Sequence, residues 1–68
     1  MNKEELGKYI KARRGILCIT QNDLAEIAGI SVRSLKDIET GKGNPTLEQM
    51  TKILNPLGLS IRLEVRNG

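Results

Sequence analysis

Residues 20–40 constrain the fold more than any other stretch, because they combine a short apolar face, a glycine and a capping serine. The apolar positions i, i+1 and i+4 of the first half are Leu24, Ala25 and Ala28. This spacing predicts a helix over Gln21–Ala28 with Thr20 as its cap. Gly29 follows where that helix has to end, and glycine adopts the left-handed conformation there without a clash from a β-carbon. The first half therefore predicts a short helix that ends in a tight turn.

A second helix is predicted directly after the turn. Ser31 is a suitable N-cap, since its hydroxyl oxygen can accept a backbone N–H from the first turn of the helix Val32–Glu39. Leu35 and Ile38 are three residues apart and form the inward face. The positions predicted to face outward are Val32, Arg33, Lys36, Asp37 and Thr40.

The two helices and their turn resemble the helix-turn-helix of the phage-repressor family (Cro/C1, or XRE). The residues that carry the resemblance are Gln21, Leu24, Ala25, Gly29, Ile30, Leu35 and Ile38, followed by Glu39 and Gly41. The resemblance implies a lambda-repressor-like DNA-binding domain. A plain hairpin of two helices in a small bundle is the alternative.

The second helix of such a motif lies in the major groove of DNA, with its N-terminal residues at the base edges. An arginine such as Arg33 can donate to guanine O6 and N7, and an aspartate such as Asp37 can accept from cytosine N4 or orient the arginine one turn away. The predicted base contacts are Val32, Arg33, Lys36 and Asp37. The predicted phosphate contacts are Gln21 at a helix start, Ser34, and Lys42 and Asn44 in the loop that runs along DNA in the family.

Two further helices complete the predicted all-α fold of four to five helices. The first runs from a cap at Asn2 to Arg14, with Leu6, Ile10 and Tyr9 inward and the lysines and Arg13 mainly outward. The last begins after Thr46 and ends or kinks near Asn55, because proline disrupts a helix interior. Its predicted apolar stripe is Leu47, Met50, Ile53, Leu54 and Leu57, and the connector before Thr20 supplies Ile16, Leu17 or Ile19 to the core.

The family resemblance also implies a structural ion pair between Arg14 and Glu39. In repressors of this family, an arginine before the motif pairs with a glutamate near the end of its second helix. We expect the pair to be largely buried and to tie the first helix to the DNA-contacting helix.

Residues Leu59–Arg66 alternate between apolar and polar side chains, which predicts a half-buried strand. A single strand leaves its backbone groups unpaired, so we predict pairing with a second copy in a homodimer. A twofold axis at Leu63 would place Arg62 opposite the partner's Glu64. The strand residues are Leu59, Ile61, Leu63 and Val65, in a division of the chain into a DNA-binding domain (1–58) and a dimerisation tail (59–68). A frayed tail is the alternative.

Composition excludes several functions. The chain has no His and one Cys, so it lacks an internal disulfide, a usual metal site and most nucleophile and acid–base sets, and we expect neither a metal, a cofactor nor an enzyme. Eleven Lys and Arg against 8 Asp and Glu give a formal charge of +3, which is compatible with a small footprint on DNA. No apolar run approaches the ~18 residues of a membrane span and no signal peptide is apparent, so we expect a cytoplasmic protein. The family resemblance implies that the cytoplasm is bacterial.

The helix-turn-helix and the tail together are similar to HipB-type antitoxins, which are dimeric repressors. The resemblance implies double-stranded DNA with an inverted-repeat operator, a second copy and a HipA-like kinase toxin as partners. Two alternatives stay open: a free-standing regulator without a toxin, and a protein-interaction module that no longer binds DNA.

Overall fold

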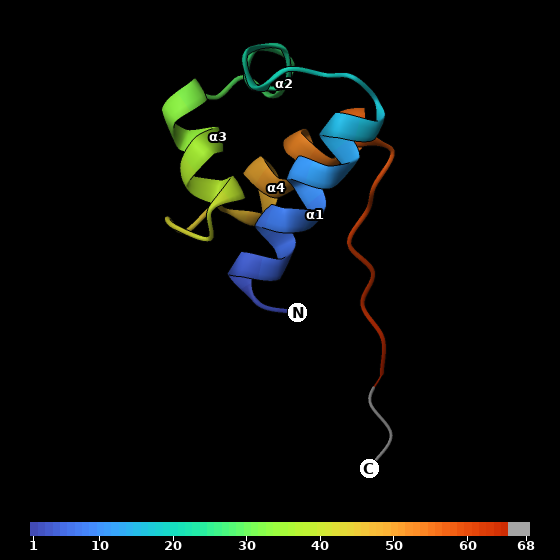
Figure 1. Ribbon diagram of the computed structural model, residues 1–68. Helices are drawn as coiled ribbons and strands as arrows, with labels where there is room; N and C mark the ends of the chain where they lie inside the picture. The colour runs from blue at the N-terminus through green and yellow to red at the C-terminus, as the bar shows by residue number, and fades with distance from the viewer. Residues whose placement is uncertain (66–68) are drawn as a thin grey trace.

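The computed structural model describes residues 1–65, and within them it contains four α-helices and one short 3-10 helix (Figure 1). The first helix, α1 (Lys3–Ile16), contacts α3 (Val32–Glu39), and the last helix, α4 (Leu47–Leu54), contacts α2 (Gln21–Ala28). The elements are α1 (Lys3–Ile16), α2 (Gln21–Ala28), α3 (Val32–Glu39), α4 (Leu47–Leu54) and η1 (Asn55–Leu57). The prediction of an all-α, lambda-repressor-like fold is confirmed for this part of the chain.

Each helix of the motif begins and ends for the predicted reason. Thr20 accepts the N–H of Asp23 at 3.0 Å, and Ser31 accepts the N–H of Ser34 at 3.0 Å. Gly29 has a φ of 71°, in the left-handed region that a β-carbon disfavours. These local bonds satisfy backbone donors that a helix start leaves free, and they fix both helix boundaries at the predicted residues.

The last helix also begins and ends as predicted. Thr46 and Gln49 form a reciprocal capping box at the start of α4. At its other end the regular helix stops at Leu54, and Pro56 lies in the 3-10 turn that follows. Gly58 closes this turn with a φ of 70°.

The core lies where the four helices meet. Its fully buried side chains are Ile10, Leu24, Leu35, Ile53 and Leu57. Of the three connector candidates, Ile19 packs against this core, whereas Ile16 and Leu17 are exposed.

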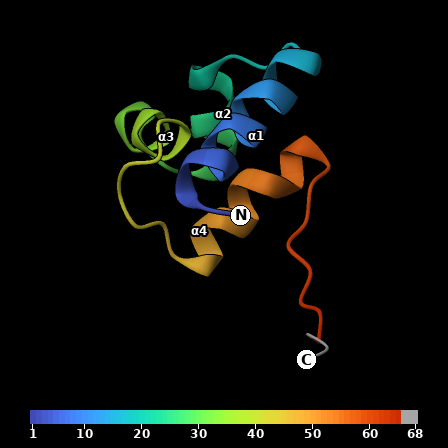
Figure 2. The same ribbon diagram turned by 60° about the horizontal axis from the view of Figure 1, so that its bottom comes forward.

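Two residues predicted to lie in the core, Tyr9 and Leu47, are exposed. Tyr9 is 58% exposed, because the buried face of α1 is centred on Gly7 and Ile10, and Tyr9 lies roughly 200° around the helix from Gly7. Leu47 is 70% exposed, because it is the first residue of α4 and that turn lies at the edge of the domain (Figure 2). The inward stripe of α4 begins instead at Met50.

The predicted strand is not present in the described part of the chain. Leu59 donates its N–H to the Leu54 oxygen at 3.0 Å. Residues 60–62 then pass beside α1 and line a pocket with Leu6 and Tyr9, and the segment that follows them extends away from the helices (Figures 1 and 2). Leu63 and Val65 are 98% and 94% exposed. A strand needs a second strand for its backbone hydrogen bonds, and residues 1–65 offer none to this segment. Arg66 lies outside the described residues, and the division into 1–58 and 59–68 stays a prediction.

Candidate nucleic-acid interface

The helix α3 presents one face to the core and the other to solvent. Leu35 and Ile38 are buried, and Leu35 is fully so. Because a helix turns about 100° per residue, this fixes Arg33 and Lys36 on the opposite side, and both are exposed. In Figure 1, α3 lies at the edge of the domain with no other helix beyond it. An exposed cationic helix face of this kind is available to a partner as large as a DNA duplex.

The four predicted base-contacting residues do not have equal access. Arg33 and Lys36 project from α3, but Val32 is half-buried and packs against the core. Asp37 is half-buried too, and it forms no ion pair with Arg33 among the residues that the structure describes. In this conformation, therefore, Asp37 does not orient Arg33.

A polar cleft of about 170 Å³ lies beside α3. The structure brings together there two of the predicted phosphate contacts, Ser34 and Asn44, with Asp37 and the unpredicted Gln49. Ser31 donates its hydroxyl to the Ser34 oxygen at 2.9 Å, so the Ser34 hydroxyl hydrogen remains for an external acceptor.

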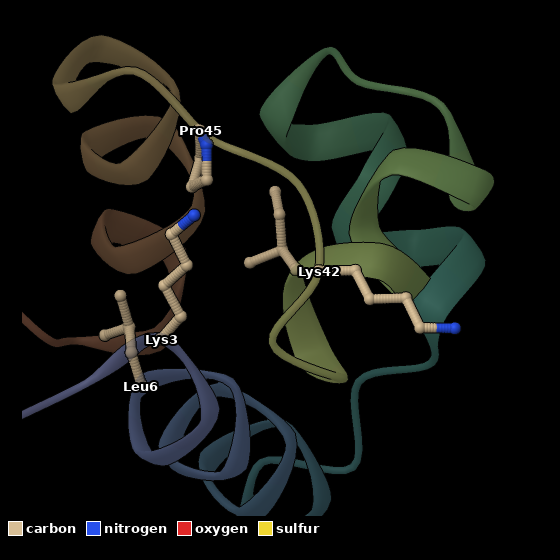
Figure 3. Close-up of a pocket in the computed structure, with 5 residues that line it drawn as sticks. Lys3, Leu6, Lys42 and Pro45 are labelled. Carbon is tan, nitrogen blue, oxygen red and sulfur yellow. The ribbon is translucent and has the colours of Figure 1, made fainter.

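The exposed loop between α3 and α4 carries Lys42, the remaining predicted cation of this face. The backbone N–H of Lys42 donates to the Asp37 oxygen at 2.7 Å, which holds the start of the loop on the last turn of α3. Its side chain projects away from α1 (Figure 3). This arrangement places an exposed positive charge on the loop that borders the polar cleft.

Behind α3, a charged network joins three helices. Arg14 donates from Nε and Nη2 to the two carboxylate oxygens of Glu39, at 2.8 and 3.1 Å. Its Nη1 donates to the Ile19 oxygen at 3.0 Å. The side chains of Arg14 and Glu39 are 15% and 2% exposed. This two-bond geometry fixes the end of α3 relative to α1, and thereby the direction in which α3 faces.

Gln21 is the third member of this network, a contact that the sequence pattern did not indicate. Its Nε2 donates to Glu39 Oε1 at 2.9 Å. An amide nitrogen has two hydrogens, so one remains for the predicted phosphate contact at the start of α2. Gln21 and Glu39 are 18 positions apart, so no local spacing in the sequence indicates that they are in contact.

One basic residue of α1, Arg13, is less exposed than predicted, and a second, Lys3, is exposed as predicted but has an unpredicted partner. Arg13 donates from Nε to the Leu57 oxygen at 2.8 Å and is half-buried. Lys3 donates to the Gly43 oxygen at 3.0 Å. Helical phase could have placed Arg13 near the face that carries Ile10, whereas the Lys3 contact joins residues 40 positions apart and depends on the assembled fold.

No group of three or more potential metal ligands occurs within residues 1–65. In the same part of the chain, none of the helices has the length and apolar character that crossing a bilayer requires.

The fold and the exposed α3 are those of a helix-turn-helix protein, and the chain belongs to this family. Its residues 10–63 match the family model described as Helix-turn-helix, whose members are non-enzymatic regulators of the Cro/C1 (XRE) type.

Particular relatives are regulators. The chain is 45% identical over 59 residues to the cryptic phage CTXphi transcriptional repressor RstR of Vibrio cholerae serotype O1. It is 30% identical over 57 residues to the HTH-type transcriptional regulator y4mF of Sinorhizobium fredii. Among solved structures, the clp gene regulator ClgR of Corynebacterium glutamicum superposes with a TM-score of 0.81 at 28% identity.

These similarities cover most of this chain but not all of each relative. They include 87%, 84% and 85% of this chain for RstR, y4mF and ClgR. The chain spans about half of RstR (49%), 75% of y4mF and 62% of ClgR.

Proposed function

We propose that this protein is a sequence-specific DNA-binding repressor of transcription that acts without a toxin partner. The observation that carries the proposal is the solvent face of α3. Arg33 and Lys36 project from a helix whose other side is buried and whose end is fixed by the Arg14–Glu39 pair. A rigidly held helix of this size, with two cations on its exposed face, fits the major groove.

The proposed phosphate contacts lie on α3 and on the segments next to it in the sequence. Gln21 lies at the start of α2, where free backbone N–H groups favour an anion. Ser34, Lys42 and Asn44 lie at and beside α3, toward the loop. Contacts of this kind position a protein on DNA, whereas Arg33 would discriminate between bases.

The regulator is favoured over the antitoxin. RstR is named a repressor, and y4mF and ClgR are named regulators. None of these three relatives is named an antitoxin. Co-purification of a kinase-like protein with this chain from its native cells would favour the antitoxin instead.

We further propose that the DNA-binding form is a dimer. Ile61, Leu63 and Val65 are exposed apolar side chains at every second position. Pairing of two such segments would cover them and satisfy their backbone groups. A twofold dimer would place two copies of α3 about 34 Å apart, which requires an inverted-repeat operator.

Selection of bound duplexes from a random-sequence pool tests the proposal, because it needs no assumption about the operator sequence. The wild-type protein should enrich an inverted repeat. Arg33→Ala should bind the enriched duplex about 5- to 150-fold more weakly, the range for loss of one bidentate base contact. Lys8→Ala is the matched control, since Lys8 is an exposed cation on the solvent side of α1.

The outcomes separate the candidate functions. Failure of the wild-type protein to enrich or bind any duplex would favour the protein-interaction module. Binding by Arg33→Ala with wild-type affinity and selectivity would remove Arg33 from the base contacts while leaving DNA binding in place.

A further inference from the structure

Lys3 lies at the first position of α1, yet its ammonium group contacts the loop between α3 and α4. It donates to the backbone oxygen of Gly43 at 3.0 Å and to the side-chain oxygen of Asn44. Lys3 and Gly43 are 40 positions apart in the sequence. Figure 3 shows the side chain of Lys3 extending from α1 toward Pro45, while the side chain of Lys42 extends away from Lys3.

The stem of Lys3 has an apolar support. A cavity of about 20 Å³ lies between α1 and the loop, lined by Lys3, Leu6, Ile38, Lys42 and Pro45. A lysine commonly packs its methylenes on apolar surface and keeps the ammonium at a polar rim. Here the rim consists of the oxygens of Gly43 and Asn44, so the contact has a defined direction.

This contact determines how the Asn44 amide is oriented. An ammonium group has three donors and no acceptor, so only the oxygen of the amide can face it. The Asn44 nitrogen then faces away with its two N–H donors, and none of the hydrogen bonds found among residues 1–65 uses them. Two N–H donors on an exposed loop beside the cleft of α3 suit a phosphate oxygen.

We propose that Lys3 is a positioning residue for DNA binding, which holds the loop and orients the Asn44 amide so that its nitrogen donates to a DNA phosphate. The inference rests on the proposed function. It goes beyond the exposed face of α3, because it gives a residue of α1 a role in DNA binding.

The backbone of the loop explains why the Lys3 contact is needed to order it. Gly41 and Gly43 have φ values of 82° and 77°. Glycine loses more conformational entropy than any other residue when its backbone is fixed, so this loop is costly to order. The hydrogen bond from the Lys42 N–H holds only the first half of the loop. Lys3 holds the second half, where Asn44 is located.

A double-mutant cycle on the duplex enriched by the wild-type protein tests the inference. Lys3→Ala should weaken binding about 2- to 10-fold, the value of one hydrogen bond, and Lys8→Ala should not. In an Asn44→Ala background, Lys3→Ala should cause little further loss, because its effect passes through Asn44. Lys3→Arg should restore most of the affinity, since arginine also donates to both oxygens. Thermal unfolding of each variant checks that the fold is retained.

The salt dependence separates positioning from direct charge. If Lys3 acts through Asn44, the slope of log K against log salt stays as in the wild-type protein. A slope smaller by about 0.9, with additive losses in the double mutant, would mean that Lys3 itself contacts a phosphate and would overturn the inference. Equal affinity of Lys3→Ala and Lys8→Ala would overturn it too, with the proposed function intact. Absence of binding by the wild-type protein would overturn both.

Discussion

A β-carbon on Gly7 would lie 2.5 Å from the backbone oxygen of Glu39. The same atom would lie 2.5 Å from the Ile38 oxygen, so α1 meets the end of α3 backbone against backbone. Both obstacles are main-chain atoms in a helix, and neither can turn aside as a side chain would. Gly7 is therefore required by the packing of α1 on α3, although glycine is a poor helix former.

Gly7→Ala is predicted to destabilise the protein. Alanine favours a helix by about 1 kcal/mol over glycine. Overpacking costs about 1–3 kcal/mol, and the rigid backbone atoms at this contact place the cost in the upper part of that range, about 2–3 kcal/mol. We expect a net loss of about 1–2 kcal/mol in the free energy of unfolding, measured by urea titration with circular dichroism. Gly15→Ala is the control in the same helix, since a β-carbon there meets nothing within 4 Å. It should be neutral or stabilising by up to about 1 kcal/mol. Equal effects of the two substitutions would contradict the close approach.

Removal of either member of the Arg14–Glu39 pair is predicted to be costly. The partner left behind would be a buried, uncompensated charge, with a penalty of about 3–5 kcal/mol. Arg14→Met and Glu39→Leu should each lower the urea midpoint strongly. The double variant should be more stable than either single variant, because it leaves no unpaired charge. If each single variant loses less than about 1 kcal/mol, the pair behaves like an exposed one and does not fix α3.

The sequence predicts the features of this fold that act within one helix, such as the Ser31 cap, but not those that depend on contact with another helix, such as Gly7. Ser31, Gly29 and Thr46 act within one turn of their own helix, so a local pattern is sufficient to place the helix ends. Gly7 acts through the end of another helix, and no local pattern contains that partner. For the same reason the prediction of an inward Tyr9 is wrong. Leu6 and Ile10 indicate an apolar face of α1, but α3 packs against Gly7, so the buried face of α1 is centred on Gly7 and Ile10 and Tyr9 is exposed.

The candidate site divides in the same way. Arg33 and Lys36 follow from helical phase once Leu35 and Ile38 are assigned to the core. The Gln21 and Lys3 contacts join residues 18 and 40 positions apart, so they depend on the assembled fold. The strand prediction rests on alternation alone, and alternation describes which face is apolar without supplying a second strand.

Lys42→Ala is predicted to weaken binding to all duplexes alike. A lysine that neutralises one phosphate releases counterions, so its removal should reduce the slope of log K against log salt by about 0.9 per protomer. Base preference should not change, because a phosphate contact carries no direct sequence information. Fluorescence anisotropy at several salt concentrations, on the selected duplex and on one of scrambled sequence, measures both effects. A changed base preference at one position would instead place Lys42 at a base edge.

The tail can be tested through its charges. With a twofold axis at Leu63, Arg62 of one protomer faces Glu64 of the partner, and each dimer contains two such pairs. Arg62→Glu alone, or Glu64→Arg alone, would bring like charges together. Because a cross-strand pair contributes about 0.2–1 kcal/mol, we expect each single reversal to raise the dimer dissociation constant at least about 2- to 30-fold. The double reversal Arg62→Glu/Glu64→Arg should restore dimerisation, since the opposite charges face each other again.

Sedimentation equilibrium of the four proteins at low salt distinguishes the possible arrangements. Restoration by the double reversal requires that the two positions face each other across the axis, and no other register gives this result. Leu63→Asp provides a check on the apolar contribution, because the exposed Leu63 would lie at the centre of the pairing. A wild-type protein that is monomeric at high concentration would remove the basis for the spacing of about 34 Å between copies of α3, and the operator would then be expected as a single half-site.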